Sequence, residues 1–291
     1  MKTVALLTAA LICNALSAGA FGAPKVIEVK VSGHGKPVIF IPGLATPGAV
    51  WEDTAKQLQD RYECHVVTVA GFGAMAPVKT AHLLDDVRDQ IIDYVRARKL
   101  DKPAIVGHSL GGTLALAIAE QAPDLPGDIV SVDGLPFLAA FRFPGVDDDE
   151  GAKKAVAAAR EAIERQTAEQ FAPHPRADSN SSQGAKTRYD QRIAELCGQS
   201  APATVAQARV EMLSADFRPA LRKIKCPILI LGALADKLQN ASRETLEANY
   251  RKQYSNAPQT RFQFFDEARH YLMIDDPAGF NTALERELAA H

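Results

Sequence analysis

The chain has 291 residues, of which 47% are hydrophobic and 23% charged, and its formal net charge is −2. These proportions are typical of a globular protein, and the length suits one large α/β domain or one domain that carries an insertion. A nearly neutral chain with a single Trp and no basic block lacks the electrostatic signature of a protein that binds nucleic acid or an acidic membrane.

The first 20 residues have the three parts of a secretory signal. Lys2 precedes an apolar run, and the run ends in small residues, with Ala18-Gly19-Ala20 as the best cleavage motif. We therefore predict a signal peptide over residues 1–20, with cleavage after residue 22 or 23 as alternatives. The mature protein is then expected in the periplasm or outside the cell, free of the membrane. The alternative is an uncleaved anchor, for which the run is barely long enough.

Export would permit disulfides, and the mature part keeps Cys64, Cys197 and Cys226. Three is an odd number, so at least one of these cysteines is free or pairs with another chain. Cys64 and Cys226 stand at the start of predicted strands, where we expect them to be small buried hydrophobic residues. The spacing of cysteines and histidines indicates no metal site.

From residue 26 onward, strand and helix patterns alternate. Residues 26–33 alternate apolar and polar side chains, as an antiparallel edge strand does, whereas the later strands are continuous apolar runs typical of strands buried on both faces. Alternation of this kind predicts a mostly parallel sheet covered by helices. In chain order, we expect strands at 26–33, 36–43, 64–73, 102–109 and 127–134, and helices at 50–61, 80–100 and 110–121.

The alternation is interrupted between residues 147 and 213, which are rich in Ala, Glu, Arg and Gln and contain no strand-like run. We expect helices there at 150–171, 186–197 and 204–215. Strand and helix patterns then resume, with strands at 225–234 and 260–270 and helices at 242–254 and 277–290. The predicted organisation is a core of residues 24–138 and 216–291 with a helical cap of residues 139–215.

The chemistry of the chain is indicated by Gly107-His108-Ser109-Leu110-Gly111, a G-x-S-x-G motif. It lies where a buried strand is expected to turn directly into a helix. Such a turn holds the serine in a strained conformation at the carboxyl edge of the sheet, and flanking glycines leave room for it. A phosphate-binding loop is the alternative, but no lysine follows the glycines as that function requires. Ser109 is therefore the candidate nucleophile.

A nucleophilic serine needs a histidine base, which a carboxylate orients. His270 is the one histidine that follows a late strand in the loop before the last helix, so we predict it as the base. His108 adjoins Ser109 on the turn, and its side chain is expected to point away from the hydroxyl. Asp236, the first carboxylate after the strand at 225–234, is the preferred orienting acid, and Asp133 is the alternative.

Two main-chain N–H groups are the candidate oxyanion donors. Leu110 begins the helix after Ser109, so its N–H is free and lies at the positive end of the helix dipole. The loop after the strand at 36–43 is the natural source of the second donor, because Gly43 allows close approach of the backbone. We predict that the N–H of Leu44 fills this role.

With these motifs in order, the chain resembles the α/β-hydrolase superfamily. The resemblance rests on PVIFIPG, VAGFG, VGHSLGG, PILILGALAD and ARHYLMIDDP and covers nearly all of the mature protein. It implies a mostly parallel central sheet flanked by helices, a helical cap insertion, and Ser-Asp-His roles for Ser109, Asp236 and His270. It implies neither a cofactor nor a metal.

The function expected from this resemblance is that of an exported serine hydrolase. Its partner would be a small molecule, a carboxylic ester of small to medium apolar character, cleaved through an acyl-enzyme. An amidase, peptidase or lactonase that uses the same triad is one alternative. A non-catalytic binding protein with the same fold is the other. The substrate itself cannot be identified from sequence, because specificity is expected to lie in the cap.

Overall fold

The structure is a computed structural model that describes residues 24–143, 145–170, 188–237 and 241–290. The predicted signal peptide lies outside these residues, as does most of the segment between the first two expected cap helices. Among the described residues, no helix is both long enough and apolar enough to span a membrane.

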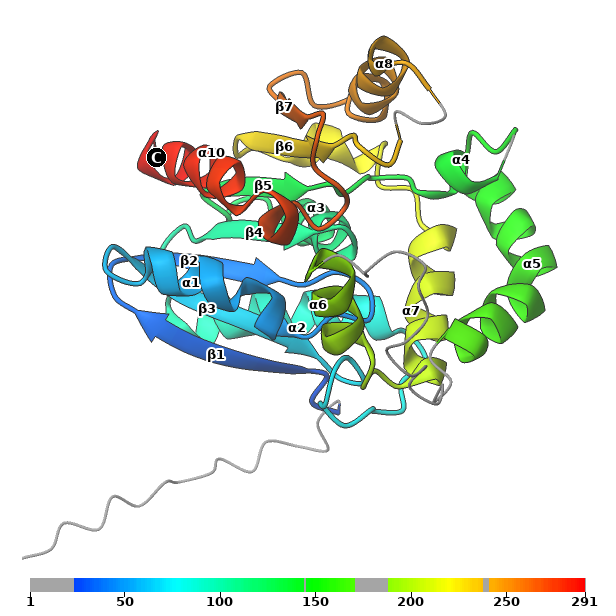
Figure 1. Cartoon of the computed structure of the whole chain (residues 1–291), viewed down its shortest axis with the longest axis horizontal. Helices are drawn as coiled ribbons and strands as arrows, with labels where there is room; N and C mark the ends of the chain where they lie inside the picture. Colours follow the sequence, from blue (N-terminus) through cyan, green and yellow to red (C-terminus); the bar gives the residue numbers. More distant parts are fainter. Residues whose placement is uncertain (1–23, 144, 171–187, 238–240, 291) are drawn as a thin grey trace, which may run out of the picture.

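A seven-stranded sheet forms the centre of the molecule, in the order β1-β3-β2-β4-β5-β6-β7. Only β1 runs antiparallel, against β3, and every other pair is parallel (Figure 1). This confirms the predicted edge strand and the mostly parallel sheet. The strands are β1 (Ile27–Gly33), β2 (Lys36–Ile41), β3 (Tyr62–Val69), β4 (Ala104–His108), β5 (Asp128–Val132), β6 (Ile228–Ala233) and β7 (Arg261–Phe265).

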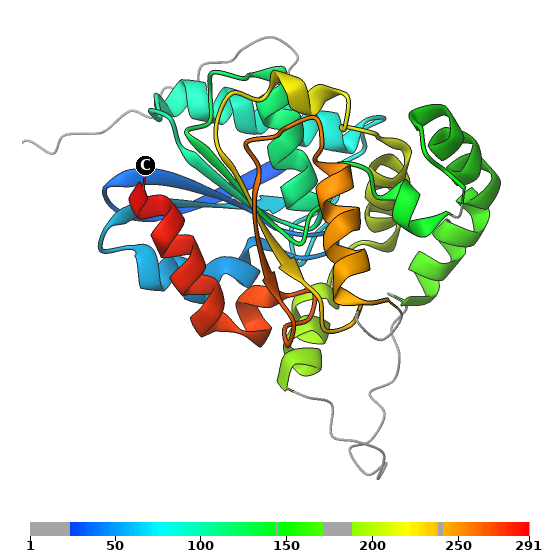
Figure 2. The same ribbon diagram turned by 90° about the horizontal axis from the view of Figure 1, so that it is seen from above.

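Helices cover both faces of the sheet, because the central strands are apolar on both sides. On one face, α1 (Glu52–Leu58) and α10 (Pro277–Ala290) pack over Phe40, Val106 and Val130. On the other face, α2 (Leu83–Arg98), α3 (Leu110–Gln121) and α8 (Arg243–Gln253) pack over Ile39 and Ile105 (Figure 2). Successive strand residues thus enter opposite cores, as the two-residue period of a strand requires.

In the described part of the segment between β5 and β6, four helices lie beyond the carboxyl ends of the strands (Figure 1). They are α4 (Ala139–Arg142), α5 (Asp149–Gln170), α6 (Arg188–Cys197) and α7 (Pro202–Ser214). They fall in the segment predicted as a cap. Helix α5 packs along α7 through Val156, Ile163 and Val210. Helix α7 also contacts helix α2, which covers the sheet, because Glu211 accepts hydrogen bonds from the first N–H groups of α2.

The remaining short elements complete the chain. These are two 3-10 turns, η1 (Gly48–Trp51) and η2 (Ala220–Lys223), and the four-residue helix α9 (Leu272–Asp275). Helix α9 follows directly on the loop that carries His270.

The register of β4 against β5 determines where the site forms. His108 pairs with Val132, so the next residues, Ser109 and Asp133, leave the sheet side by side at its carboxyl edge. Both have a left-handed backbone, with φ of 50° at each. This conformation is uncommon for a residue with a Cβ and is characteristic of strained functional turns.

Candidate functional site

Ser109 occupies the turn between β4 and α3, where its backbone adopts φ 50° and ψ −112°. The flanking glycines are required sterically. A Cβ at Gly107 would lie 2.1 Å from the main-chain oxygen of Gly111, and a Cβ at Gly111 would lie 2.2 Å from that of Ile41. Both obstacles are backbone atoms, which cannot move aside. The predicted strand-to-helix turn is therefore present, with the serine at its apex.

Ser109 and His270 line the same cavity of about 280 Å³, together with Leu44. A second recess of about 100 Å³ next to it is also lined by Ser109 and His270, and there by Asp133 as well. A larger cavity of about 880 Å³ lies beside β1 and α1 but contains none of these residues. Size alone therefore does not mark the candidate site, whereas the convergence of Ser109 and His270 does.

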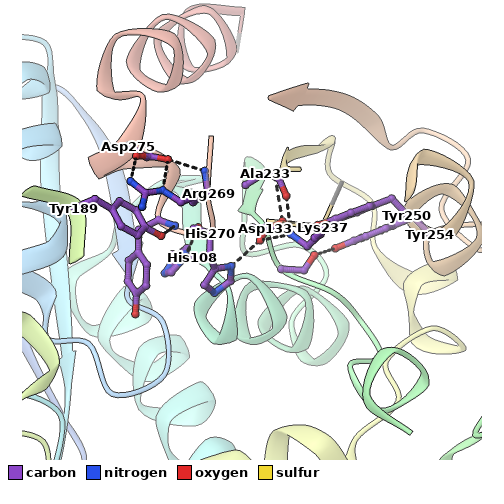
Figure 3. Close-up of polar contacts among 12 residues, drawn as sticks. His108, Asp133, Tyr189, Ala233, Lys237, Tyr250, Tyr254, Arg269, His270 and Asp275 are labelled. Carbon is purple, nitrogen blue, oxygen red and sulfur yellow. Dashed lines mark hydrogen bonds and ion pairs between the residues drawn. The ribbon is translucent and has the colours of Figure 1, made fainter. Parts of the chain in front are cut away.

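His270 is oriented by Asp133, whose Oδ2 lies 2.6 Å from the imidazole Nδ1 (Figure 3). The Asp133 side chain is only 1% exposed, while that of His270 is 41% exposed and faces the cavity. The choice of Asp236 as the orienting acid is wrong, because its side chain is exposed to solvent and the hydrogen bond to His270 comes from Asp133. Asp133, the alternative, occupies the expected place.

Distance from the strand end explains the difference between the two acids. Asp133 follows Val132, the last residue of β5, and the strand itself aims it at the edge of the sheet. Asp236 lies three residues beyond Ala233, the last residue of β6, on a turn that projects into solvent. Asp133 therefore stands directly at the strand end, whereas Asp236 does not.

Asp133 is held by an unusually dense set of donors. Lys237 Nζ lies 2.8 Å from Oδ1 and 2.7 Å from Oδ2, the Ala233 N–H donates to Oδ1 at 3.2 Å, and the Tyr250 hydroxyl also donates to Oδ1 (Figure 3). Burial alone would raise the pKa of the Asp133 carboxyl, but the Lys237 charge and the hydrogen bond from His270 outweigh it and hold that pKa well below its usual range. Asp133 is therefore ionised.

An ionised carboxylate can only accept hydrogen bonds, so the Nδ1 of His270 must carry the proton. In the neutral ring, Nε2 then keeps its lone pair. This is the tautomer that a general base needs.

The His108 side chain fixes the main chain of His270. Its side chain is fully buried, and its Nε2 donates to the main-chain oxygen of His270 at 3.0 Å. Burial lowers the pKa of His108 to about 3, so the ring stays neutral at ordinary pH. The side chain is thus committed to fixing the His270 backbone. Gly43 makes room for it, because a Cβ there would lie 2.6 Å from the His108 Nδ1.

An ion pair holds the loop on the other side of His270. The Arg269 guanidinium binds the Asp275 carboxylate at 2.7 and 3.0 Å and lies over the Tyr189 ring at 3.6 Å (Figure 3). The Tyr189 hydroxyl in turn accepts a hydrogen bond from the Tyr271 N–H at 3.1 Å. Tyr189 lies on α6, so the cap segment contributes to the position of the base.

The two predicted oxyanion donors lie next to Ser109. Leu110 is the first residue of α3, and Leu44 lines the cavity that Ser109 shares with His270. Within the described part of the chain, neither main-chain N–H donates to a protein acceptor. Both N–H groups are therefore free to bind a ligand, and their role as donors stays a prediction.

Neither a metal centre nor a disulfide forms among the residues that the structure describes. No cluster of three His, Cys, Asp or Glu side chains occurs there. Cys64, Cys197 and Cys226 are all free, and the first and last are buried, as expected.

Several residues that hold Asp133 or line the cavity were not predicted from the sequence. Lys237 and Tyr250 hold Asp133, and Arg142 and Arg209 line the cavity beside Ser109. Lys237 stood next to the favoured Asp236 without an assignable role. Tyr250 lies in a helix far along the chain, and no local pattern predicts that it reaches Asp133.

Known proteins resemble the chain over most of its length. It is 28% identical over 259 residues to the pimeloyl-[acyl-carrier protein] methyl ester esterase of Vibrio cholerae, covering 86% of this chain and 93% of that protein. It is 26% identical over 219 residues to the 2-(acetamidomethylene)succinate hydrolase of Mesorhizobium japonicum, covering 74% and 77%. The structure of an esterase from Thermogutta terrifontis superposes with a TM-score of 0.69 at 21% identity, covering 91% and 93%, which shows the shared fold.

A sequence profile described as the alpha/beta hydrolase family matches residues 38–283. This span contains the G-x-S-x-G turn, both histidines of the site and Asp133. Together with a sheet and helix arrangement of the same kind, the match shows that the chain belongs to the alpha/beta hydrolase family.

Proposed function

We propose that the protein is an exported serine hydrolase that cleaves a carboxylic ester through an acyl-enzyme. One observation carries the proposal: Ser109, on a strained turn, shares a cavity with His270, whose Nδ1 is held by the buried and ionised Asp133. This is the arrangement that activates a serine hydroxyl on many unrelated folds.

The reaction begins with attack of the Ser109 Oγ on the acyl carbon of the ester. His270 Nε2 takes the hydroxyl proton as the Oγ–C bond forms, and the Asp133 carboxylate stabilises the resulting imidazolium. The carbonyl oxygen becomes an oxyanion, to which the N–H groups of Leu44 and Leu110 donate. Loss of one such donor typically costs about 2.7–4 kcal/mol of transition-state stabilisation.

The tetrahedral species then collapses. The bond to the leaving oxygen breaks, and His270 returns its proton to that oxygen, so an alcohol leaves and the acyl group stays on Ser109. A water molecule attacks the acyl carbon, with its proton taken by His270. The Oγ–C bond breaks, Ser109 recovers its proton, and a carboxylic acid is released.

The names of the similar proteins include both an ester and an acetamido compound as substrates. The methyl ester esterase, which is similar to this chain over 93% of its own length, supports an ester. The 2-(acetamidomethylene)succinate hydrolase keeps amide cleavage as the alternative. An ester also makes the smallest demand on the site, because an alkoxide leaves more readily than an amide nitrogen.

Labelling with a fluorophosphonate probe tests the nucleophile. We expect the wild type and Ser255→Ala to label, since Ser255 is exposed and lines neither cavity of the site, and Ser109→Ala to remain unlabelled. A panel of aryl esters, anilides and lactones measures the preference for esters. Wild-type protein that neither labels nor hydrolyses any short ester would refute the proposal.

Export is tested separately, by fractionating cells that express the full chain and sequencing the N-terminus of the protein. A periplasmic or secreted product that begins at Phe21 is expected. A product that keeps Met1 in the cytosol would refute export and leave the hydrolase proposal intact.

A further inference from the structure

Two arginines line the cavity that Ser109 shares with His270. Arg142 ends α4 and Arg209 lies on α7, so both come from the segment between β5 and β6. No acidic side chain lines this cavity. Within the described residues, neither guanidinium forms an ion pair with a carboxylate, and Arg209 Nη1 donates instead to the neutral Thr167 hydroxyl at 3.3 Å.

This arrangement is electrostatically unfavourable without a bound anion. Arg209 is half-buried, and both burial and the nearby Arg142 charge lower its pKa. The two like charges repel one another, and Arg209 also loses hydration, whereas Arg142 is exposed to solvent. A bound carboxylate would relieve both penalties, because a guanidinium matches its geometry and binds it with charge-assisted hydrogen bonds.

Two other partly buried arginines are neutralised by carboxylates of the protein. Arg218 binds Asp216 at 2.6 Å, and Arg269 binds Asp275 at 2.7 Å. Lys237, the remaining cation beside Ser109, directs its ammonium group at both Asp133 oxygens and at the Ala233 carbonyl, 2.6 Å away. An ammonium has three N–H groups, so Lys237 has no donor left for a ligand. The two arginines of the cavity are the cations available to a substrate.

The rest of the cavity wall is apolar. Its lining includes the apolar side chains of Leu44, Leu138, Met212 and Leu213. A matching substrate has an apolar segment beside the ester and an anionic group beyond it.

We infer that the preferred substrates are esters that carry a free carboxylate, which Arg142 and Arg209 bind while Ser109 attacks the ester. This inference rests on the proposed function and narrows it, because the apolar ester expected from the sequence would leave both arginines without an anionic partner.

The test compares esters that differ only in charge. The acyl-side pair is the monomethyl and dimethyl esters of each dicarboxylic acid from succinate to adipate, and the alcohol-side pair is 4-acetoxybenzoate and its methyl ester. We expect kcat/KM to favour the carboxylate form by about 10- to 100-fold in at least one pair, and this preference to fall as salt is added. Because a dimethyl ester has two equivalent ester groups, its rate is divided by two before the comparison.

Variants assign the preference to the arginines. Arg209→Met and Arg142→Met should each reduce the ratio of the two kcat/KM values at least fivefold. Arg209→Lys should reduce this ratio less, because it keeps the charge and loses only the guanidinium that donates two parallel hydrogen bonds to a carboxylate. Arg165→Met is the matched control, because Arg165 is an exposed arginine of α5 outside the cavity, and it should leave the ratio unchanged. Binding of glutarate to Ser109→Ala, measured by calorimetry, provides a readout that does not depend on turnover, and it should weaken in the same arginine variants.

The two proposals fail in different ways. If Ser109 is not the nucleophile, the fluorophosphonate does not label it and no ester is turned over. If only the present inference is wrong, neutral esters are hydrolysed at least as fast as their carboxylate forms, and the arginine variants leave both the ratio and the binding of glutarate unchanged.

Discussion

Replacement of Asp133 by Asn is the sharpest test of how the site is built. The change keeps the size of the side chain and removes its charge. In the native protein the carboxylate accepts the Nδ1 proton of His270 at 2.6 Å in an environment that leaves the side chain 1% exposed. No water can take its place there, so the imidazole loses both its orientation and its counter-charge.

The expected loss is large. In a Ser-His-Asp triad, the same substitution lowers kcat by about 10⁴-fold, which corresponds to about 5 kcal/mol of activation free energy. Asp133→Asn also leaves the Lys237 ammonium, whose side chain is 23% exposed, without a counter-ion. Removal of one partner of a buried ion pair costs about 3–5 kcal/mol of stability, and partial exposure of Lys237 places the expected cost near 3 kcal/mol.

A double variant separates catalysis from stability. Asp133→Asn/Lys237→Met removes the unpaired charge together with the carboxylate, so urea denaturation should show much of the lost unfolding free energy restored while kcat stays low. Asp236→Asn is the matched control, because this exposed carboxylate should change kcat less than twofold. Rates are measured on a short aryl ester at pH 8 with fully folded protein.

The reasoning about the triad acid fails if Asp133→Asn keeps more than a tenth of the wild-type kcat. It also fails if Asp236→Asn loses activity to the extent expected for Asp133→Asn.

Three further predictions concern the residues around the site. Lys237→Met removes the main charge that lowers the pKa of Asp133. The stability that this carboxylate provides is present above about pH 3.9 and is lost as pH falls through its native pKa. Raising that pKa should therefore reduce the unfolding free energy, by about 3 kcal/mol near neutral pH. His108 has a pKa of about 3 in the folded protein and an ordinary value of 6.5 in the unfolded chain, so the unfolded chain binds a proton first as pH falls. The unfolding free energy should therefore decrease below pH 6.5, by about 2 kcal/mol at pH 5. His108→Gln should make the unfolding free energy less dependent on pH in this range. Gly107→Ala places a Cβ 2.1 Å from the Gly111 oxygen and should prevent correct folding, as judged by soluble yield and thermal unfolding.

Each of these predictions has a matched control. Lys56→Met and His34→Gln alter exposed residues and should leave both the urea midpoint and its pH dependence unchanged. Gly151→Ala adds a Cβ that meets only the side chains of Asp148 and Val146, and no backbone, and should fold normally. A Lys237 variant as stable as wild type, a His108 variant with unaltered pH dependence, or a Gly107 variant with a native melting temperature would each contradict the corresponding argument.

The sequence by itself determined the fold class and the positions of Ser109 and His270 as the candidate nucleophile and base. Short continuous apolar runs that alternate with amphipathic helical patterns indicate strands buried on both faces, and they predicted the parallel sheet and its covering helices. The G-x-S-x-G turn placed Ser109 at the carboxyl edge, and it needs glycine at 107 because a Cβ there would lie 2.1 Å from the Gly111 oxygen. These are local properties, readable from neighbouring residues.

The tertiary structure alone decided which acid reaches the base and what else surrounds it. Asp133 and Asp236 both follow strands, and only the register of β5 beside β4 brings Asp133 next to Ser109 and within 2.6 Å of His270. Lys237 and Tyr250 converge on Asp133 from separate turns and helices, and Arg142 and Arg209 meet at the cavity from different helices of the insertion. Such contacts depend on how distant elements pack, and no short-range pattern in the chain encodes them.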